Sequence, residues 1–215
     1  EISACLVGSE MCIRDSYRKN IDENQLSDLR AKLHILDDAF VIGFTGRLVR
    51  DKGIIELIRA FHLLQEKYSD MVLLLVGMLE ERDALPRDVV DVMKSNPKII
   101  YTGYVSNALI EYYYALMNCF VLPSYREGFP TSVLEASAME LPVITTKVTG
   151  CIDSIIENKT GFFVEHTVCE LANVIERLYI SKDKCYALGT QGRQFVVDNF
   201  EEKIIWEEIE KLYNG

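Results

Sequence analysis

Two glutamates, Glu127 and Glu135, are separated by seven residues in the stretch "PSYREGFPTSVLEASAMELPVI". A loop carboxylate can accept hydrogen bonds from sugar hydroxyls, and one in the first turns of a helix can reach a ribose diol while the helix N-terminus receives phosphate. The residues between them are predicted to form a turn whose backbone N–H groups face the same crevice: Gly128, Phe129, Pro130 and Thr131. A second interpretation stays open, because Ser132-x-x-Glu135 is also a capping box and Glu127 is compatible with a solvated loop. Spacing alone favours this second interpretation.

The loop "GFTGRLVRDKGIIEL" has a different chemical character. Gly43 and Gly46 permit a tight turn at the end of a strand, and Gly53 opens the next helix. Arg47 and Lys52 flank a helix N-terminus, and the arginine fork and compact lysine charge suit a diphosphate. The loop is equally compatible with a solvated turn whose glycines serve only the backbone. It is neither a Walker A motif nor a GxGxxG sequence, which disfavours nucleoside triphosphates and dinucleotides as ligands.

The elements that carry these loops alternate along the chain. Six short apolar segments are predicted to be strands: 39–46, 71–77, 98–105, 118–124, 142–146 and 161–165. Segments with helical spacing of apolar residues precede or follow them: 20–35, 54–68, 86–95, 107–117, 131–140, a short helix from Cys151, and helices from 167 to 213.

This alternation predicts an α/β fold with a doubly wound, Rossmann-like parallel sheet and C-terminal helices. Ligands of such sheets bind beyond the carboxyl ends of the strands. The loops of interest therefore follow six residues: Thr45, Val76, Tyr101, Leu122, Thr145 and Val164.

Composition excludes some classes of function. The 215 residues allow one domain or two small ones, and the net charge of −10 argues against a nucleic-acid partner, which requires a basic face. The six cysteines form no CxxC pair, which indicates free thiols in the cytosol and no zinc site.

Four stretches occur in an order that resembles a known family: "GRLVRDKG", "LLLVG", "IIYTGYV" and "PSYREGFPTSVLEASAMELPVITTKVTG". Together they are similar to the C-terminal, donor-binding domain of retaining glycosyltransferases of the GT-B fold, closest to glycosyltransferase family 4 (group 1). The resemblance covers about residues 20–215. The spacing of Glu127 and Glu135 matches the paired glutamates of this family, which overturns the capping-box interpretation.

The resemblance implies a nucleotide-sugar donor, usually UDP-linked, bound without a required metal or other cofactor. Arg47 and Lys52 would neutralise the diphosphate as the glycosidic bond breaks, and Glu127 would hold the transferred sugar, which makes these three the predicted catalytic residues. Glu135 would bind the ribose hydroxyls. The remaining predicted donor-binding residues are Gly46, Gly77, Gly128, Phe129, Pro130 and Thr131, with Gly103, Tyr104 and Val105 bordering the nucleobase.

The sequence also departs from the family. The loop after the second strand, "GMLEERDALP", retains only Gly77 of a glycine-rich pattern, and Pro130 stands where many members have glycine or a small residue. "VTGCIDSI" keeps only Gly150 and Asp153 of the commoner pattern. The aromatic run 112–114 is interpreted as helix packing and not as a sugar platform, because adjacent helical residues face different directions.

By this resemblance, the chain is predicted to be one half of a GT-B enzyme that transfers a hexosyl group to a glycan, lipid-linked or other acceptor. The partner is an N-terminal domain, so the 215 residues alone are expected to bind nucleotide weakly and to transfer nothing. The full enzyme is placed in the cytoplasm, with peripheral contact at the inner membrane face left open. A nucleotide-sugar epimerase of related architecture and a non-catalytic nucleotide-sugar-binding module remain as alternatives.

The first 16 residues are predicted to lie outside the nucleotide-sugar-binding domain, which is assigned to residues 17–215. Leu6 to Asp15 can be written as CTC GTG GGC TCG GAG ATG TGT ATA AGA GAC, which resembles a transposase adapter used in sequencing libraries. We therefore interpret residues 5–16 as translated adapter, with a genuine disordered arm as the weaker alternative. Residues 5–16 are therefore not expected to contribute to the function of the domain.

Overall fold

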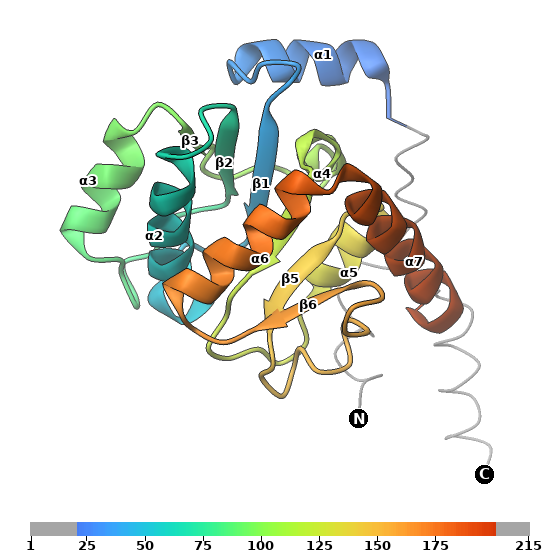
Figure 1. Cartoon of the computed structure of the whole chain (residues 1–215). Helices are drawn as coiled ribbons and strands as arrows, with labels where there is room; N and C mark the ends of the chain where they lie inside the picture. Colours follow the sequence, from blue (N-terminus) through green and yellow to red (C-terminus); the bar gives the residue numbers. More distant parts are fainter. Residues whose placement is uncertain (1–20, 201–215) are drawn as a thin grey trace.

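The computed structural model describes residues 21–200 (Figure 1). The adapter interpretation of residues 5–16, and the predicted helical segment beyond residue 200, lie outside the described residues. The predicted division at residue 17 therefore stays a prediction.

A six-stranded, all-parallel sheet forms the centre of the molecule, in the strand order β3-β2-β1-β4-β5-β6. Its strands are β1 (Phe40–Thr45), β2 (Met71–Val76), β3 (Ile99–Tyr101), β4 (Cys119–Leu122), β5 (Val143–Thr146) and β6 (Gly161–Val164). Strands β1, β2, β4 and β5 are buried along their whole length. Their sequences are therefore mostly apolar on both faces, apart from Thr45, Thr145 and Thr146 at the carboxyl ends of β1 and β5. The predicted doubly wound sheet is confirmed.

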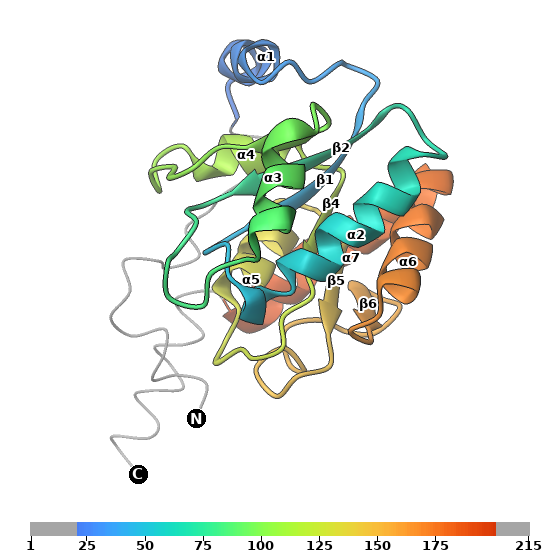
Figure 2. The ribbon, with the colours of Figure 1, turned by 90° about the vertical axis from the view of Figure 1, so that its left-hand side faces the viewer.

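Helices cover both faces of this sheet (Figure 2). Helix α2 (Ile54–Gln65) buries a stripe that includes Ile54, Leu57, Ile58 and Phe61, and it packs beside α6 (Val168–Ile180). On the opposite face α5 (Thr131–Ala138) packs beside α7 (Lys182–Phe200). The other helices are α1 (Glu23–Lys32), α3 (Arg87–Ser95) and α4 (Ile110–Leu116), and a 3-10 turn, η3 (Arg50–Lys52), precedes α2.

The connection between β5 and β6 differs from the prediction, since no helix begins at Cys151. Single turns replace it: the Cys151 N–H donates to the Val148 carbonyl at 2.8 Å, and the Ser154 N–H donates to the Cys151 carbonyl at 3.0 Å. The Ser154 hydroxyl also donates to that carbonyl at 2.7 Å, and side-chain bonds of this kind compete with helix propagation. The predicted short helix is therefore wrong, although the parallel pairing of β5 with β6 is right.

Candidate functional site

A cavity of about 1000 Å³ opens at the carboxyl ends of β1 and β2 and extends to the first turns of α4 and α5. This volume is enough for a ligand of nucleotide size. All the predicted catalytic and donor-binding residues line it except Gly103 and Gly128: Gly46, Arg47, Lys52, Gly77, Tyr104, Val105, Glu127, Phe129, Pro130, Thr131 and Glu135. Gly103 does not line the cavity itself, but its carbonyl accepts from the N–H of the lining residue Gly77 at 3.0 Å.

Gly46 and Gly77 bring two strand-end loops unusually close together. Gly77 has a φ of +140°, and a Cβ atom there would lie 1.8 Å from the Gly46 carbonyl oxygen. A side chain at position 77 would therefore meet rigid backbone in a conformation that L residues rarely adopt. These two glycines therefore allow the backbones of the two loops to be in direct contact where they line the cavity.

A partly buried ion pair occupies the part of the cavity nearest η3. Lys52 Nζ donates to Glu127 Oε1 at 2.6 Å, and the two side chains are 20% and 7% exposed. Arg47 differs, because its side chain is 63% exposed and pairs with Glu80 at 3.0 Å. The two residues predicted to bind the diphosphate are thus held differently. Lys52 is held by the Glu127 carboxylate inside the cavity, whereas Arg47 pairs with Glu80 at the surface.

The fully buried residue Ser124 fixes the orientation of the Glu127 side chain. Its hydroxyl donates to Glu127 Oε1 at 2.6 Å. Its carbonyl accepts from the Thr146 hydroxyl and from His166 Nε2, which lies 2.9 Å away and must carry the hydrogen because a carbonyl only accepts. His166, placed outside the motif loops by its sequence position, therefore supports the Glu127 loop.

The "VTGCIDSI" stretch departs from the family pattern but keeps Gly150, and the packing of the loop after β5 requires a glycine there. A Cβ atom at this position would lie 2.2 Å from the Glu127 carbonyl oxygen and 2.6 Å from that of Gly128. The loop after β5 therefore packs directly against the backbone of the Glu127 loop, and any side chain would push the two apart.

We expect Ser124→Ala to lower the melting temperature by roughly 3–6 °C, because the variant removes a buried hydrogen bond to a charged group. Ser137→Ala is the matched control. Ser137 is equally buried, but its hydroxyl has no partner among the described residues. Thermal unfolding of both variants measures the difference, and equal melting temperatures would contradict the role given to Ser124.

A second polar group lies where β1, α4 and α5 meet. The Tyr114 hydroxyl donates to Glu135 Oε2 at 2.7 Å and lies 2.6 Å from Thr45 Oγ1. The capping-box interpretation is wrong: Pro130 occupies the N-cap of α5, and no side chain caps the helix. Burial raises the pKa of the Glu135 carboxyl, whereas the bond from Tyr114 lowers it.

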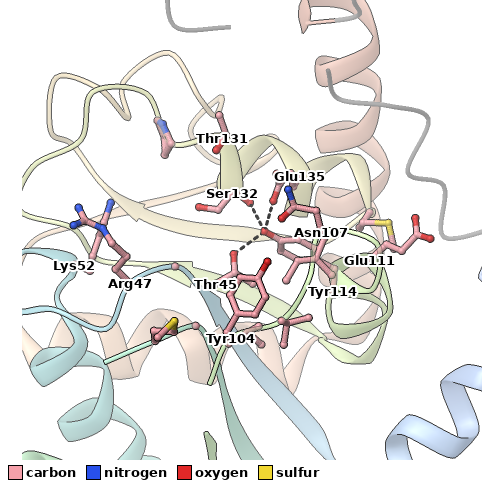
Figure 3. Close-up of a pocket in the computed structure, with 18 of the residues that line it drawn as sticks. Thr45, Arg47, Lys52, Tyr104, Asn107, Glu111, Tyr114, Thr131, Ser132 and Glu135 are labelled. Atoms are coloured by element: carbon pink, nitrogen blue, oxygen red, sulfur yellow. Dashed lines mark hydrogen bonds between the residues drawn. The ribbon is translucent and has the colours of Figure 1, made fainter. Parts of the chain in front are cut away.

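Figure 3 shows that these groups occupy two regions of the cavity. Arg47 and Lys52 lie together, apart from the group formed by Thr45, Tyr114 and Glu135. The cavity therefore offers cations in one region and hydrogen-bonding oxygens in the other.

Several lining residues were not predicted from the sequence. The interpretation of the run 112–114 as helix packing holds for the Tyr114 ring, which is 1% exposed and lies 5.8 Å from the Phe120 ring. Its hydroxyl nevertheless reaches the cavity wall, and no local pattern signals this contact. The other unpredicted polar residues of the lining are Thr45, Glu80, Asn107, Glu111 and Ser132.

Residues 21–200 contain no group of three or more His, Cys, Asp or Glu side chains that could hold a metal ion. That the donor binds without a required metal stays a prediction. The four cysteines in this range, Cys119, Cys151, Cys169 and Cys185, are free. In the same part of the chain no helix is long and apolar enough to cross a membrane.

Comparison with known proteins gives matches along most of the chain. Residues 27–195 match the family model described as "Glycosyl transferases group 1". The capsular polysaccharide biosynthesis glycosyltransferase CapM of Staphylococcus aureus is 40% identical over 195 residues, which cover 90% of this chain and 50% of CapM. The chain thus spans about half the length of this relative.

Two solved structures share the fold. The C-terminal domain of LpcC, a group 1 glycosyltransferase of Francisella tularensis, has a TM-score of 0.77 at 23% identity, covering 89% of this chain and 99% of that domain. Anabaena HepE, solved in complex with UDP-glucose, has a TM-score of 0.81 at 21% identity, covering 95% of this chain and 55% of HepE. At these identities the likeness concerns the fold alone.

Proposed function

Because the chain belongs to the group 1 family of glycosyltransferases and has the fold of the C-terminal half of a GT-B enzyme, we propose that its cavity binds the nucleotide-sugar donor of a retaining hexosyl transfer. The donor is a UDP-sugar, and the acceptor is a glycan, a lipid-linked sugar or another hydroxyl compound. The HepE complex with UDP-glucose supports the choice of donor, since a protein of this fold binds it. The family match favours a transferase over the epimerase considered above.

The observation that carries the proposal is that one cavity holds two separate polar regions, one with cations and one with a carboxylate held by a hydroxyl. The partly buried Lys52–Glu127 pair lies in one region, and Glu135, held by Tyr114, lies in the other. The diphosphate and transferred sugar would occupy the first region. The ribose would occupy the second, with the base near Tyr104, which is 73% exposed.

Transfer breaks the bond between the anomeric carbon and the diphosphate oxygen and forms a bond from that carbon to the acceptor oxygen, which loses its proton. Negative charge develops on the departing UDP, which can take up that proton. Lys52 carries three N–H donors, so it can keep its bond to Glu127 while it donates to the diphosphate. Arg47, on its exposed arm, adds a second cation. Donors already in place stabilise the leaving group without reorganisation, and the proposed site requires no metal.

The acceptor side would be supplied by an N-terminal GT-B domain, consistent with a chain that spans half of CapM. Exposed apolar side chains on the loops after the strands, among them Met78, Tyr104 and Ile152, would face that domain. We further propose a cytoplasmic enzyme, in peripheral contact with the membrane where its acceptor is lipid-linked.

Calorimetric titration of the native chain tests the donor site. UDP is expected to bind with one-to-one stoichiometry, and uridine, which lacks the diphosphate, is expected to bind at least about tenfold more weakly. GDP serves as the base control, and preference for UDP over GDP would support the uridine assignment. Absence of UDP binding, or equal binding of UDP and uridine, would overturn the proposal.

A further inference from the structure

The hydroxyl group of Tyr114 joins three elements of the cavity wall (Figure 3). It donates to Glu135 Oε2 at 2.7 Å and lies 2.6 Å from Thr45 Oγ1. Tyr114 belongs to α4, Glu135 to α5, and Thr45 is the last residue of β1. The Tyr114 side chain is 1% exposed, so water competes little for these bonds.

The direction of these bonds follows from the chemistry of the groups. A tyrosine hydroxyl carries one hydrogen, and an ionised carboxylate can only accept. Burial, with the charge of Glu135, raises the pKa of the Tyr114 hydroxyl, so the group stays protonated. Its hydrogen goes to Glu135, and Thr45 donates to the Tyr114 oxygen. Glu135 Oε2 is thereby held, whereas Oε1 makes no hydrogen bond with the described residues.

We propose that Tyr114 is a positioning residue that fixes the rotamer of Glu135, so that the carboxylate presents Oε1 to the 2′- and 3′-hydroxyls of the donor ribose. This inference rests on the proposed function, which brings a ribose to Glu135. An unrestrained glutamate samples several rotamers, and fixing one of them before the ligand arrives lowers the entropy cost of binding. Thr45 anchors the Tyr114 hydroxyl to the sheet in turn.

A packing role alone would not require the hydroxyl. The Tyr114 ring already packs on Phe120, and phenylalanine would fill the same space. Burying a hydroxyl costs free energy unless it is hydrogen-bonded. The bonds to Glu135 and Thr45 meet that requirement and make the hydroxyl useful to the site.

Tyr114→Phe removes the hydroxyl and keeps the ring. UDP is expected to bind this variant about tenfold more weakly, through loss of one hydrogen bond that orders a charged group. Binding of 2′,3′-dideoxyuridine diphosphate is expected to be unchanged, because that ligand has no ribose hydroxyls for Glu135. Tyr113→Phe is the matched control on the same helix, since Tyr113 lies outside the cavity lining, and it should bind both ligands as the native chain does.

A double-mutant cycle separates positioning from general loosening. In the Glu135→Ala background, which removes the acceptor of the Tyr114 hydroxyl, Tyr114→Phe is expected to cause no further loss of UDP affinity. Equal losses for UDP and the dideoxy ligand, additive losses in the cycle, or native affinity for UDP in Tyr114→Phe would each overturn the role of Tyr114. Failure of the native chain to bind UDP would instead overturn the donor site, and this inference with it.

Discussion

Lys52→Met is expected to weaken UDP binding by roughly 10- to 150-fold while leaving uridine binding unchanged. The lysine is the less exposed of the two cations in the cavity, and its bond to Glu127 holds its ammonium group before the ligand arrives. A charge-assisted hydrogen bond to a diphosphate contributes about 1.5–3 kcal/mol, which corresponds to roughly 10- to 150-fold in affinity. Calorimetry with both ligands measures the change, and uridine reports any general damage to the cavity.

The same substitution is expected to destabilise the fold. It leaves the Glu127 carboxylate, which is 7% exposed, without its cation, and breaking such a pair costs about 3 kcal/mol, or roughly 6–12 °C in melting temperature. The double variant Lys52→Met/Glu127→Gln removes both charges and should recover most of this loss without recovering UDP binding. Native UDP affinity in Lys52→Met, or recovered affinity in the double variant, would refute the role of Lys52.

The sheet could be predicted from the sequence because its signal is local. The central strands are short, mostly apolar runs that are buried on both faces, as in "MVLLLV" of β2, and turn residues or helices bound each run. The connection after β5 was harder to predict. There the structure depends on the close approach of Gly150 to the Glu127 backbone and on the side chain of Ser154, which are contacts that a helical pattern does not report.

The site was only partly predictable for a related physical reason. The loops at the strand ends could be found because parallel strands end at one edge, which brings Arg47, Lys52 and Glu127 together. The groups that orient the glutamates come from distant positions: Tyr114 contacts Glu135 from the preceding helix, and His166 supports Ser124 from beyond β6. Periodicity assigns Tyr114 to the core, which is correct for its ring but says nothing about its hydroxyl.

The two glutamates share a design that follows from these contacts. Each accepts a hydrogen bond from a buried hydroxyl, Glu127 from Ser124 and Glu135 from Tyr114. They differ in charge balance, because Glu127 has Lys52 as a cation whereas Glu135 has no ion pair with the described residues. A buried carboxylate without a cation destabilises the fold, so Glu135 is the position where function and stability should conflict.

Glu135→Gln is therefore expected to bind UDP roughly 10- to 100-fold more weakly and to be more stable than the native chain at pH 7. Burial raises the pKa of this carboxyl above its ordinary value of 4.5. The stabilisation by the protonated form is fully present below pH 4.5 and is lost as the pH rises through the folded-state pKa, so the ionised group costs stability at neutral pH. Glutamine stays neutral and can still accept from Tyr114.

Melting temperatures of the Glu135→Gln and native chains between pH 4 and pH 8 measure this conflict. The advantage of the variant should grow as the pH rises above 4.5, the ordinary pKa of the carboxyl, and should level off above its raised folded-state pKa. Glu140→Gln is the matched control, since Glu140 follows the same helix but lies outside the cavity lining. A constant difference across this range would show that the glutamine acts through packing, and a variant that bound UDP like the native chain would remove Glu135 from the donor site.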